Sequence, residues 1–575
     1  MKIEPVKSFN LNNFKELADM CCERNPDGAA FRWLNGKDIV EKTYKAFRSD
    51  IDALGTYFFY NGLKKQKIAV IGENCYEWIL TYFATVIGGN VIVPIDRDLT
   101  SDSIINVLKA SGAKALIYTD TYKKVIDDIK KAAGVKAFNI NEFDTLLSEG
   151  RELLQKGKTK YIDIEINPDE LSTIIYTSGT TGTPKGVMLS QRNIVENACY
   201  CIEYEELTGS TLLVLPIHHT FGFTASVVAV MMYGQPIAIN KNLRTFLNDI
   251  QVFQPQSIFV VPMFVEAIYK KIWKNAEQKK ISVVLKGLIK TSDGLRKLGI
   301  DKRKKMFKTV TDAFGGNLTL IISGGAALDP MYCKFFDSIG IDLINGYGIT
   351  ECSPIVAVNP IRHNKPGSVG LVLRNSQVEI IDKDENGNGE ICVAGSSVML
   401  GYYNNKEATE EAFNDIWFKT GDLGHLDEDN YLYISGRKKN LIILANGKNI
   451  YPEEIEELLL RIPEVIETVV YSEDETITAE IYTEDPTAVQ AAVKTLNKTL
   501  PIYKHIKNIK FRISHNLQMS VFKLHNIFVT VVFSKNRIKF SSPFRKKLVD
   551  RSRTETAIFL NLLRNFICII NFKFI

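Results

Sequence analysis

Short apolar runs followed by polar turns recur along the first 140 residues, with segments of helical length between them. Lys67–Ile71 is such a run, and the apolar segment Trp78–Ile87 separates it from the next one, Val91–Ile95. A strand, a helix and a strand at this spacing indicate a βαβ unit with parallel strands. We expect Ala115–Tyr118 and Lys136–Ile140 to extend the same sheet.

The same reading extends to both ends of the chain. Residues 11–60 alternate helix-like stretches with short polar breaks, so helices are expected there. Leu212–Pro216 and the apolar run that begins at Leu318 are expected to be strands that lead into functional turns. A compact α+β unit is expected after residue 439. Its expected segments are the strands Leu441–Ala445, Glu467–Tyr471 and Ile477–Tyr482 and the helices Tyr451–Leu460 and Pro486–Leu500.

The composition is that of a globular protein, with 575 residues, 45% hydrophobic and 24% charged. No apolar stretch reaches the roughly 18 residues of a membrane helix. The first residues, Met1–Pro5, hold no long apolar run, so we expect no signal peptide. Nine cysteines without a C-x-x-C pair or a zinc-spaced Cys/His cluster indicate reduced thiols and a cytoplasmic protein.

The formal net charge of +5 is unevenly distributed. His515–Ile575 holds eleven Lys or Arg and two Asp or Glu, whereas the rest of the chain holds 60 basic and 64 acidic residues. The main body is therefore mildly acidic, which gives no support for nucleic-acid binding.

One polar loop lies between two apolar runs at Thr173–Leu189. Its glycines allow a tight turn and a close approach to a ligand, and its hydroxyls and backbone N–H groups can donate to phosphate oxygens. The loop does not match the G-x-x-x-x-G-K-[ST] phosphate motif. A flexible surface loop is the other interpretation, but Pro184, Lys185 and Gly186 directly after the glycines favour a polyphosphate site. The loop residues singled out are Thr177, Ser178, Gly179, Thr180, Thr181, Gly182 and Lys185.

Tyr176–Gly186 resembles the phosphate loop of the adenylate-forming superfamily, which includes acyl-CoA synthetases, luciferases and peptide-synthetase adenylation domains. The resemblance covers residues 10 to 513 and implies further sites in a fixed order. Leu318–Pro330 is similar to the adenine-binding turn, where only small residues at Gly324, Gly325 and Ala326 would let a flat ring lie along the backbone. A plain strand–helix connection is the alternative for this turn.

The segment Ile341–Cys352 is similar to a second family motif, which includes Asn345, Gly346, Tyr347 and Gly348. By resemblance, Tyr347 stacks on adenine, Thr350 donates to the α-phosphate and Glu351 binds Mg²⁺. Carboxylate oxygens are ligands that Mg²⁺ prefers, and such ions bridge phosphate oxygens. The hydroxyl of Thr177 is implied as a second metal ligand.

Two charged residues further along match the family's ribose site. Asp422 can accept both ribose hydroxyls, and Arg437 can add a charged donor to the ribose or phosphate. Taken singly, each would be an ordinary surface charge. Their order and their distance from the phosphate loop favour the ribose role.

Two adjacent histidines, His218 and His219, follow the run Leu212–Pro216. A packed or solvated histidine pair is one interpretation. The family resemblance instead places His219 beside the acyl pocket, where it can orient a carboxylate near the α-phosphate, with Phe223 lining or gating an acyl channel. The apolar run Ala225–Tyr233 is expected to pack in the core, and part of it can line a tunnel.

The resemblance implies an α/β fold with a large N-terminal domain, residues 1–438, built from two α/β subdomains and a β-rich subdomain. A small mobile α+β domain, residues 439–513, follows a hinge at Lys439, and Lys448 is expected to act in its catalytic face. Residues 514–575 form an atypical basic tail that is rich in Phe. A family member would carry a Lys-Thr-x-x-Gly-Lys stretch after Phe511. Here Lys523 is the only lysine near that place, and Phe522 and Leu524 flank it.

A changed reading frame and a basic membrane-surface tail are two explanations for this ending. The implied function is ATP- and Mg²⁺-dependent activation of a fatty acid as acyl-AMP, with release of pyrophosphate and transfer of the acyl group to CoA. The alternatives are adenylation of another acid, such as an amino or aryl acid, transfer to a carrier protein, and an impaired nucleotide-binding homologue. The expected partners are a fatty acid, ATP and CoA, with no nucleic acid and possible peripheral membrane contact through the basic tail.

Overall fold

The computed structural model describes residues 4–177, 184–204, 207–443, 449–473 and 476–512, and the backbone of residues 531–534 and 537–540. The described chain divides into two compact units, one that ends at Lys439 and one that begins at Asn440. This division lies at the residue expected to be the hinge, and the expected rotation about it stays a prediction.

The first unit contains a seven-stranded sheet with the strand order β18-β8-β7-β4-β3-β5-β6. Strands β7, β4, β3, β5 and β6 are parallel, whereas β8 is antiparallel to both β7 and β18. The bounds are β3 Lys67–Ile71, β4 Val91–Ile95, β5 Ala115–Tyr118, β6 Lys136–Asn139, β7 Leu171–Thr177, β8 Lys185–Ser190 and β18 Gly401–Tyr402. The predicted βαβ unit is confirmed, since α3 (Tyr76–Ile87) connects β3 to β4.

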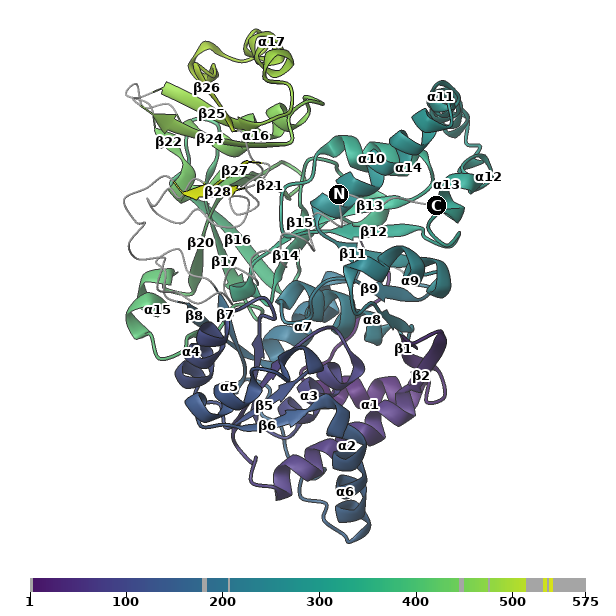
Figure 1. Ribbon diagram of the computed structural model, residues 1–575, viewed down its shortest axis with the longest axis vertical. Helices are drawn as coiled ribbons and strands as arrows, with labels where there is room; N and C mark the ends of the chain where they lie inside the picture. The colour runs from purple at the N-terminus through teal and green to yellow at the C-terminus, as the bar shows by residue number, and fades with distance from the viewer. Residues whose placement is uncertain are drawn as a thin grey trace. The chain divides into compact units, whose positions relative to one another are not determined.

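Both faces of this sheet are covered, which explains why its central strands are apolar along their whole length. In β3, Ile68 and Val70 face one hydrophobic cluster, and Ala69 and Ile71 face another. Helices α4 and α5 pack on the second face, and α2 and α3 belong to the first (Figure 1).

The helices of this unit are α1 Phe14–Arg24, α2 Tyr44–Tyr60, α3 Tyr76–Ile87, α4 Ser101–Ser111, α5 Ile126–Ala133, α6 Phe143–Gln155, α7 Gln191–Cys201, α8 Ala229–Met232, α9 Phe246–Phe253, α10 Pro262–Gln278, α11 Ser282–Lys297, α12 Arg303–Met306, α13 Lys308–Asp312, α14 Pro330–Ser338 and α15 Lys406–Ala412. A π-helix, η3, spans Phe221–Val228 and runs directly into α8.

A 14-stranded sheet forms the rest of this unit, in the order β16-β17-β20-β21-β15-β14-β13-β12-β11-β9-β10-β1-β2, with β19 beside β20. The bounds are β1 Ala29–Asn35, β2 Asp38–Thr43, β9 Thr211–Leu213, β10 Ile237–Ile239, β11 Ser257–Val260, β12 Leu320–Ser323, β13 Asp342–Gly348, β14 Ile355–Val358, β15 Gly370–Val372, β16 Ser376–Ile381, β17 Gly389–Gly395, β19 Phe413–Asn414, β20 Trp417–Leu426 and β21 Tyr431–Arg437.

Strand β13 joins the two halves of the larger sheet. Its first residues, Asp342–Asn345, pair with β12 in parallel, and its last residues, Gly346–Gly348, pair with β14 in the antiparallel direction. The half that contains β12, β11, β9, β10 and β1 is parallel, and the half from β14 to β16 is antiparallel. The expected combination of α/β subdomains with a β-rich subdomain is confirmed.

The expectation of helices throughout residues 11–60 is wrong for residues 29–43. Those residues form the antiparallel pair β1–β2, in which Asn35 lies opposite Asp38. The two-residue turn begins at Gly36, whose φ of 64° favours glycine. The turn is therefore Gly36-Lys37, and a glycine at the first position of a two-residue turn between runs that contain β-branched and aromatic residues is the hairpin signal that was overlooked.

The second unit is a small α+β body. Its three-stranded sheet has the order β24-β25-β26, and β22 pairs with β23 separately. Helices α16 and α17 supply Ile455, Leu459, Val489 and Val493 to a common core with these strands. The bounds are β22 Ile442–Ile443, β23 Asn449–Ile450, α16 Pro452–Leu460, β24 Glu467–Glu473, β25 Thr476–Tyr482, α17 Pro486–Asn497 and β26 Asn508–Arg512.

The expected strands and helices of this unit are therefore present, although the expected turn at Asn446-Gly447 lies outside the described residues. In the tail, where no regular period was expected, β27 (Val531–Ser534) and β28 (Arg537–Phe540) pair with each other. Among the helices that the structure describes, none is both long and apolar enough to cross a membrane.

Candidate active site

The phosphate-loop candidate lies between two paired strands. Thr177 ends β7 and Lys185 begins β8, and these two residues lie opposite each other. The Thr177 hydroxyl donates to the backbone oxygen of Lys185 at 3.5 Å. Ser178, Gly179, Thr180, Thr181 and Gly182 lie outside the described residues, so their phosphate-binding roles stay predictions.

One side chain, that of Tyr402, contacts both Lys185 and Glu351, the predicted metal ligand. The Lys185 Nζ lies 4.8 Å from the centre of the Tyr402 ring, and the Tyr402 hydroxyl donates to Glu351 Oε1 at 3.0 Å. A cation over an aromatic face and a hydrogen bond to a carboxylate are both favourable. The structure therefore brings Lys185 and Glu351, which are 166 residues apart in the sequence, to the same tyrosine, with the lysine over the ring and the glutamate at the hydroxyl.

Tyr402 is fixed on both its backbone and its side chain. It pairs with Val187 as part of β18, and its N–H donates to the Thr409 hydroxyl at 2.9 Å. Burial and the neighbouring Glu351 carboxylate raise the pKa of Tyr402, so its hydroxyl stays protonated and remains a donor at neutral pH. Sequence analysis missed this residue.

The turn that carries Thr350 and Glu351 is anchored by a buried asparagine. The two residues begin η5 (Thr350–Cys352). Asn197 of α7 donates from Nδ2 to the Ile355 oxygen at 2.7 Å and accepts from the Ile355 N–H at 3.1 Å. Because Asn197 is fully buried, these bonds are shielded from water and hold the chain just after Glu351.

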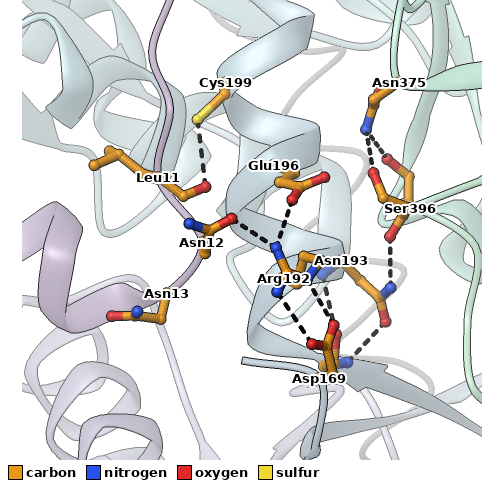
Figure 2. Close-up of polar contacts among 12 residues, drawn as sticks. Leu11, Asn12, Asn13, Asp169, Arg192, Asn193, Glu196, Cys199, Asn375 and Ser396 are labelled. Carbon is orange, nitrogen blue, oxygen red and sulfur yellow. Dashed lines mark hydrogen bonds and ion pairs between the residues drawn. The ribbon is translucent and has the colours of Figure 1, made fainter. Parts of the chain in front are cut away.

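Helix α7 makes a second set of contacts one turn earlier. Asn193 completes a capping box with Ser190 at the start of the helix. Its Nδ2 also donates to the Ser396 oxygen at 2.7 Å, and Figure 2 shows this bond. Residues four apart lie on one helix face, so Asn193 and Asn197 connect β8 to the segments around Ser396 and Glu351.

Arg192 fixes the outer side of the same helix. Its guanidinium donates to Asp169 Oδ1 at 2.6 Å, to Asn12 Oδ1 at 2.6 Å and to Glu196 Oε1 at 2.9 Å (Figure 2). Asp169 precedes β7 and Asn12 precedes α1. The start of α7, directly after β8, is therefore held from several sides.

A second polar chain joins the residues expected to bind adenine and ribose. The Tyr347 hydroxyl donates to Asp422 Oδ2 at 2.5 Å, and Arg437 Nε lies 2.7 Å from Asp422 Oδ1. Asp422 and Arg437 face each other across β20 and β21. Burial and the Asp422 charge raise the pKa of Tyr347. Three residues predicted from separate motifs thus form one connected group.

The predicted adenine turn follows β12. Gly325 has a φ of 83°, and Gly325 and Ala326 are exposed. A Cβ at Gly324 would lie 3.1 Å from the Phe221 ring, so the turn also packs closely on its inner side. Ser323 Oγ and Asn345 Oδ1 are buried and have no hydrogen-bond partner in the described chain. They lie on facing residues of β12 and β13 and leave two acceptors unused beside this turn.

The two histidines form a cluster with Asp96, which sequence analysis also missed. His218 Nε2 lies 3.2 Å from Asp96 Oδ1, and the rings of His218 and His219 are 4.2 Å apart. Burial and the neighbouring His218 lower the pKa of His219 to about 4. Burial alone would raise the pKa of Asp96, but the neighbouring His218 lowers it to about 2.

His219 borders a small apolar cavity behind this cluster. The residues that line it are Tyr82, Pro94, Ile175, Ile194, Ile217, His218, His219, Thr220, Phe223 and Thr224. Its free volume is about 10 Å³, roughly room for one water molecule. Phe223 and Tyr82 both line it, and their ring centres are 3.9 Å apart. The run Ala225–Met232 behind Phe223 is buried, as expected.

The structure therefore connects Lys185 to Glu351 through Tyr402, and Tyr347 to Arg437 through Asp422. His219 belongs to a separate cluster with His218 and Asp96. Lys448 lies outside the described residues, so its role stays a prediction. Tyr402 had a weak signal in the sequence, since Gly401-Tyr402-Tyr403 directly precedes a polar stretch. Asn197 and Asp96 carried no comparable signal.

The chain is similar to known proteins over most of its length. Residues 18–403 match the family model described as AMP-binding enzyme. The chain is 30% identical over 422 residues to the long-chain-fatty-acid–CoA ligase FadD15 of Mycobacterium bovis, covering 69% of each chain. It is 25% identical over 517 residues to a long-chain-fatty-acid–CoA ligase of Salmonella typhimurium, covering 79% of this chain and 85% of that protein.

The fold is also similar to that of an enzyme whose structure has been solved. The o-succinylbenzoate CoA synthetase MenE of Bacillus subtilis, in complex with its acyl-adenylate, superposes with a TM-score of 0.71 at 21% identity, covering 89% of this chain and 98% of that one. The family match spans more than half of the chain and includes Lys185, Glu351 and Tyr402. The chain is a member of the AMP-binding enzyme family.

Proposed function

We propose that this enzyme activates a fatty acid with ATP and transfers it to CoA. The carboxylate attacks the α-phosphate to give acyl-AMP and pyrophosphate, and the CoA thiol then attacks the acyl carbon and releases AMP. The main structural support is the arrangement of Lys185, Tyr402 and Glu351 at the end of the β7–β8 pair. The names of the related fatty acid ligases support the choice of substrate.

The residues present fit a magnesium ion. Glu351 provides carboxylate oxygens, its side chain is only half-buried, and Tyr402 binds one of its two oxygens. The Thr177 hydroxyl is the second predicted ligand, and hard oxygen donors are the set that Mg²⁺ prefers. When bound, the ion supplies charge neutralisation for phosphate oxygens. The protein's own contribution is to fix the direction of the Glu351 carboxylate.

Positioning and charge account for the rest of the proposed chemistry. Lys185 supplies a positive charge next to the predicted phosphate loop, and Thr350 supplies a hydroxyl donor at the start of η5. Asp422 and Arg437 are proposed to hold the ribose, with Tyr347 and the Gly324–Ala326 turn around the adenine. The unused acceptors of Ser323 and Asn345 fit a base that carries an amino group.

His219 and the cavity behind it are proposed to receive the acid. The lowered pKa of His219 keeps its ring neutral at pH 7, so it can orient the carboxylate by hydrogen bonding and does not pair with it as a cation. The lining behind His219 is mainly apolar, which suits an alkyl chain. An alkyl chain needs this cavity to open, because it now has room for about one water molecule and Phe223 is among its lining residues.

A different acid is the main alternative, and MenE shows that this fold also serves aryl acids. An amino acid would require a free carboxylate for its ammonium group. Asp96 is the acid nearest to His219, but His218 lies 3.2 Å from its carboxylate. The cavity lining contains no Asp or Glu. These contacts favour a fatty acid over an amino acid.

The test is ATP–pyrophosphate exchange measured against acids of increasing chain length, with amino and aryl acids as comparison. Each buried CH₂ is expected to add about 0.8 kcal/mol of binding until the pocket is full. KM should therefore fall by about fourfold per carbon. An amino acid as best substrate, or a KM independent of chain length, would contradict the proposal.

An impaired homologue is the second candidate because the family's C-terminal lysine motif is absent from the sequence after Phe511. It predicts normal ATP binding with slow acyl-AMP formation, while thioester formation from supplied acyl-AMP is less affected. Adenylation at ordinary synthetase rates, unchanged in Lys523→Ala, would exclude it. Lys523 lies outside the described residues.

A further inference from the structure

One short segment of the first unit has a charge opposite to that of its surroundings. Lys279–Lys308 holds eleven Lys or Arg and only two acids, Asp293 and Asp301. The rest of the first 514 residues holds 49 basic and 62 acidic residues. This positive charge surrounds α11, so it is a local property of one surface and not a consequence of the overall composition.

Helix α11 is an outer-layer helix. Leu285 and Ser292 are its buried residues, and the Ser292 hydroxyl donates to the Ser338 oxygen at the end of α14. The only acid of α11, Asp293, accepts from the Ser338 hydroxyl at 3.1 Å. The helix therefore turns its single negative charge inward, and Figure 1 shows α11 at the outer edge of this part of the unit.

The opposite side of α11 combines lysines with exposed apolar residues. At 100° per residue, Val283, Lys286, Lys290 and Lys297 fall on one side of the helix, away from Leu285. Val283 is 79% exposed and Leu298, just beyond the helix, is 75% exposed. We define the α11 face as Val283, Lys286, Lys290, Lys297 and Leu298.

The charges of the α11 face are not balanced by neighbouring acids. Lys286, Lys290 and Lys297 form no ion pair with the residues that the structure describes, whereas Arg296, on the inner side, pairs with Asp337. Five of the sixteen large apolar side chains that are exposed in the described chain lie within Ile281–Ile300. Single exposed apolar residues are ordinary, but this concentration among lysines without an acidic partner is not.

We infer that the α11 face docks on an anionic lipid membrane. Lysines attract acidic headgroups, and apolar side chains between them can enter the boundary of the acyl chains. A nucleic acid would satisfy the lysines but would leave Val283 and Leu298 exposed to water. The inference is independent of the acid that the enzyme activates and of residues 514–575.

The test is sedimentation of the full chain with vesicles of phosphatidylcholine, alone or mixed with phosphatidylglycerol. Binding is expected only to the mixed vesicles and should weaken as salt is raised. Reversing three lysines in Lys286→Glu, Lys290→Glu and Lys297→Glu should weaken it by at least about a hundredfold, taking about fivefold per basic residue. The matched control, Lys123→Glu, Lys124→Glu and Lys131→Glu, changes the net charge equally at exposed lysines elsewhere and should bind normally.

A second variant tests the lipid assignment. Val283→Ser with Leu298→Ser leaves every charge in place and should weaken vesicle binding by about tenfold or more, since each side chain loses apolar contact. Unchanged vesicle binding in this variant, together with tight binding of the unmodified chain to duplex DNA, would overturn the inference in favour of a polyanion site. Unchanged binding in the α11 lysine variant would overturn it in favour of another surface, such as the basic tail. Adenylation measured with a short soluble acid should be equal in all variants, which shows that they are folded.

Discussion

Tyr402→Phe is the substitution that tests the proposed site most directly. It removes the hydroxyl that donates to Glu351 Oε1 at 3.0 Å and leaves the ring that lies 4.8 Å from Lys185 Nζ. The strand pairing and the backbone bond of residue 402 to Thr409 do not depend on the hydroxyl. The change therefore isolates one hydrogen bond to the predicted metal ligand.

The magnitude follows from the type of bond. A hydrogen bond to a charged group contributes about 1.5–3 kcal/mol, and the lower end applies here because Glu351 is only half-buried. About 1.5 kcal/mol corresponds to roughly a tenfold change in an equilibrium or rate constant. We expect this loss in the apparent affinity for Mg²⁺, because the carboxylate can then rotate away from the position that binds the ion.

The assay is ATP–pyrophosphate exchange measured over a range of Mg²⁺ concentrations. Tyr403→Phe is the matched control, since Tyr403 is the adjacent residue and its ring faces Lys67, with the Lys67 Nζ 5.3 Å from the ring centre. The Mg²⁺ dependence should shift about tenfold in Tyr402→Phe and remain normal in Tyr403→Phe. Equal Mg²⁺ dependence in the two variants would refute the proposed role of Tyr402.

Three further predictions follow from the same site. Glu351→Ala and Lys185→Ala should each slow acyl-AMP formation about a hundredfold, as expected for an electrostatic contact to phosphate, and near-normal rates in both would remove this site from consideration. Asn197→Ala should lower the free energy of unfolding by about 3 kcal/mol, because it leaves the buried backbone groups of Ile355 without partners; an unchanged denaturant midpoint would show that the contacts are replaced. The pKa of His219 is lowered from 6.5 to about 4. The neutral ring therefore contributes to the free energy of unfolding above pH 6.5, and this contribution is lost as the pH falls toward 4. An NMR titration of this ring with an inflection near pH 6.5 would show that burial does not disfavour its charged form.

Much of the fold was predictable because the βαβ pattern is a local signal. Lys67–Ile71 and Val91–Ile95 are strands with the predicted bounds. The β1–β2 hairpin was missed because Ala29–Thr43 alternates poorly between apolar and polar residues, and its burial pattern shows mainly half-buried positions after Phe31. In this segment the glycine at the turn, Gly36, indicates a hairpin, whereas the alternation of apolar and polar residues does not.

The candidate site was predictable only in part, because a motif names residues but not their neighbours. Tyr347, Asp422 and Arg437 were each expected from separate motifs, and the structure joins them through one carboxylate. Tyr402 could not be placed in the same way. Its contact with Glu351 depends on the pairing of the two-residue strand β18 with β8, which no local pattern reveals.

Helix α7 explains how residues so far apart in the chain reach one site. Lys185 begins β8, and the capping box of Ser190 and Asn193 starts α7 directly after that strand. Strand β8, which begins with Lys185, therefore leads directly into a helix whose Asn197 holds the chain after Glu351. Because a one-residue slip of β8 would turn its side chains to the other face and move the helix cap, the register of β8 and the placement of Glu351 are determined together. Strand β8 and the turn that carries Glu351 are therefore expected to move as one body.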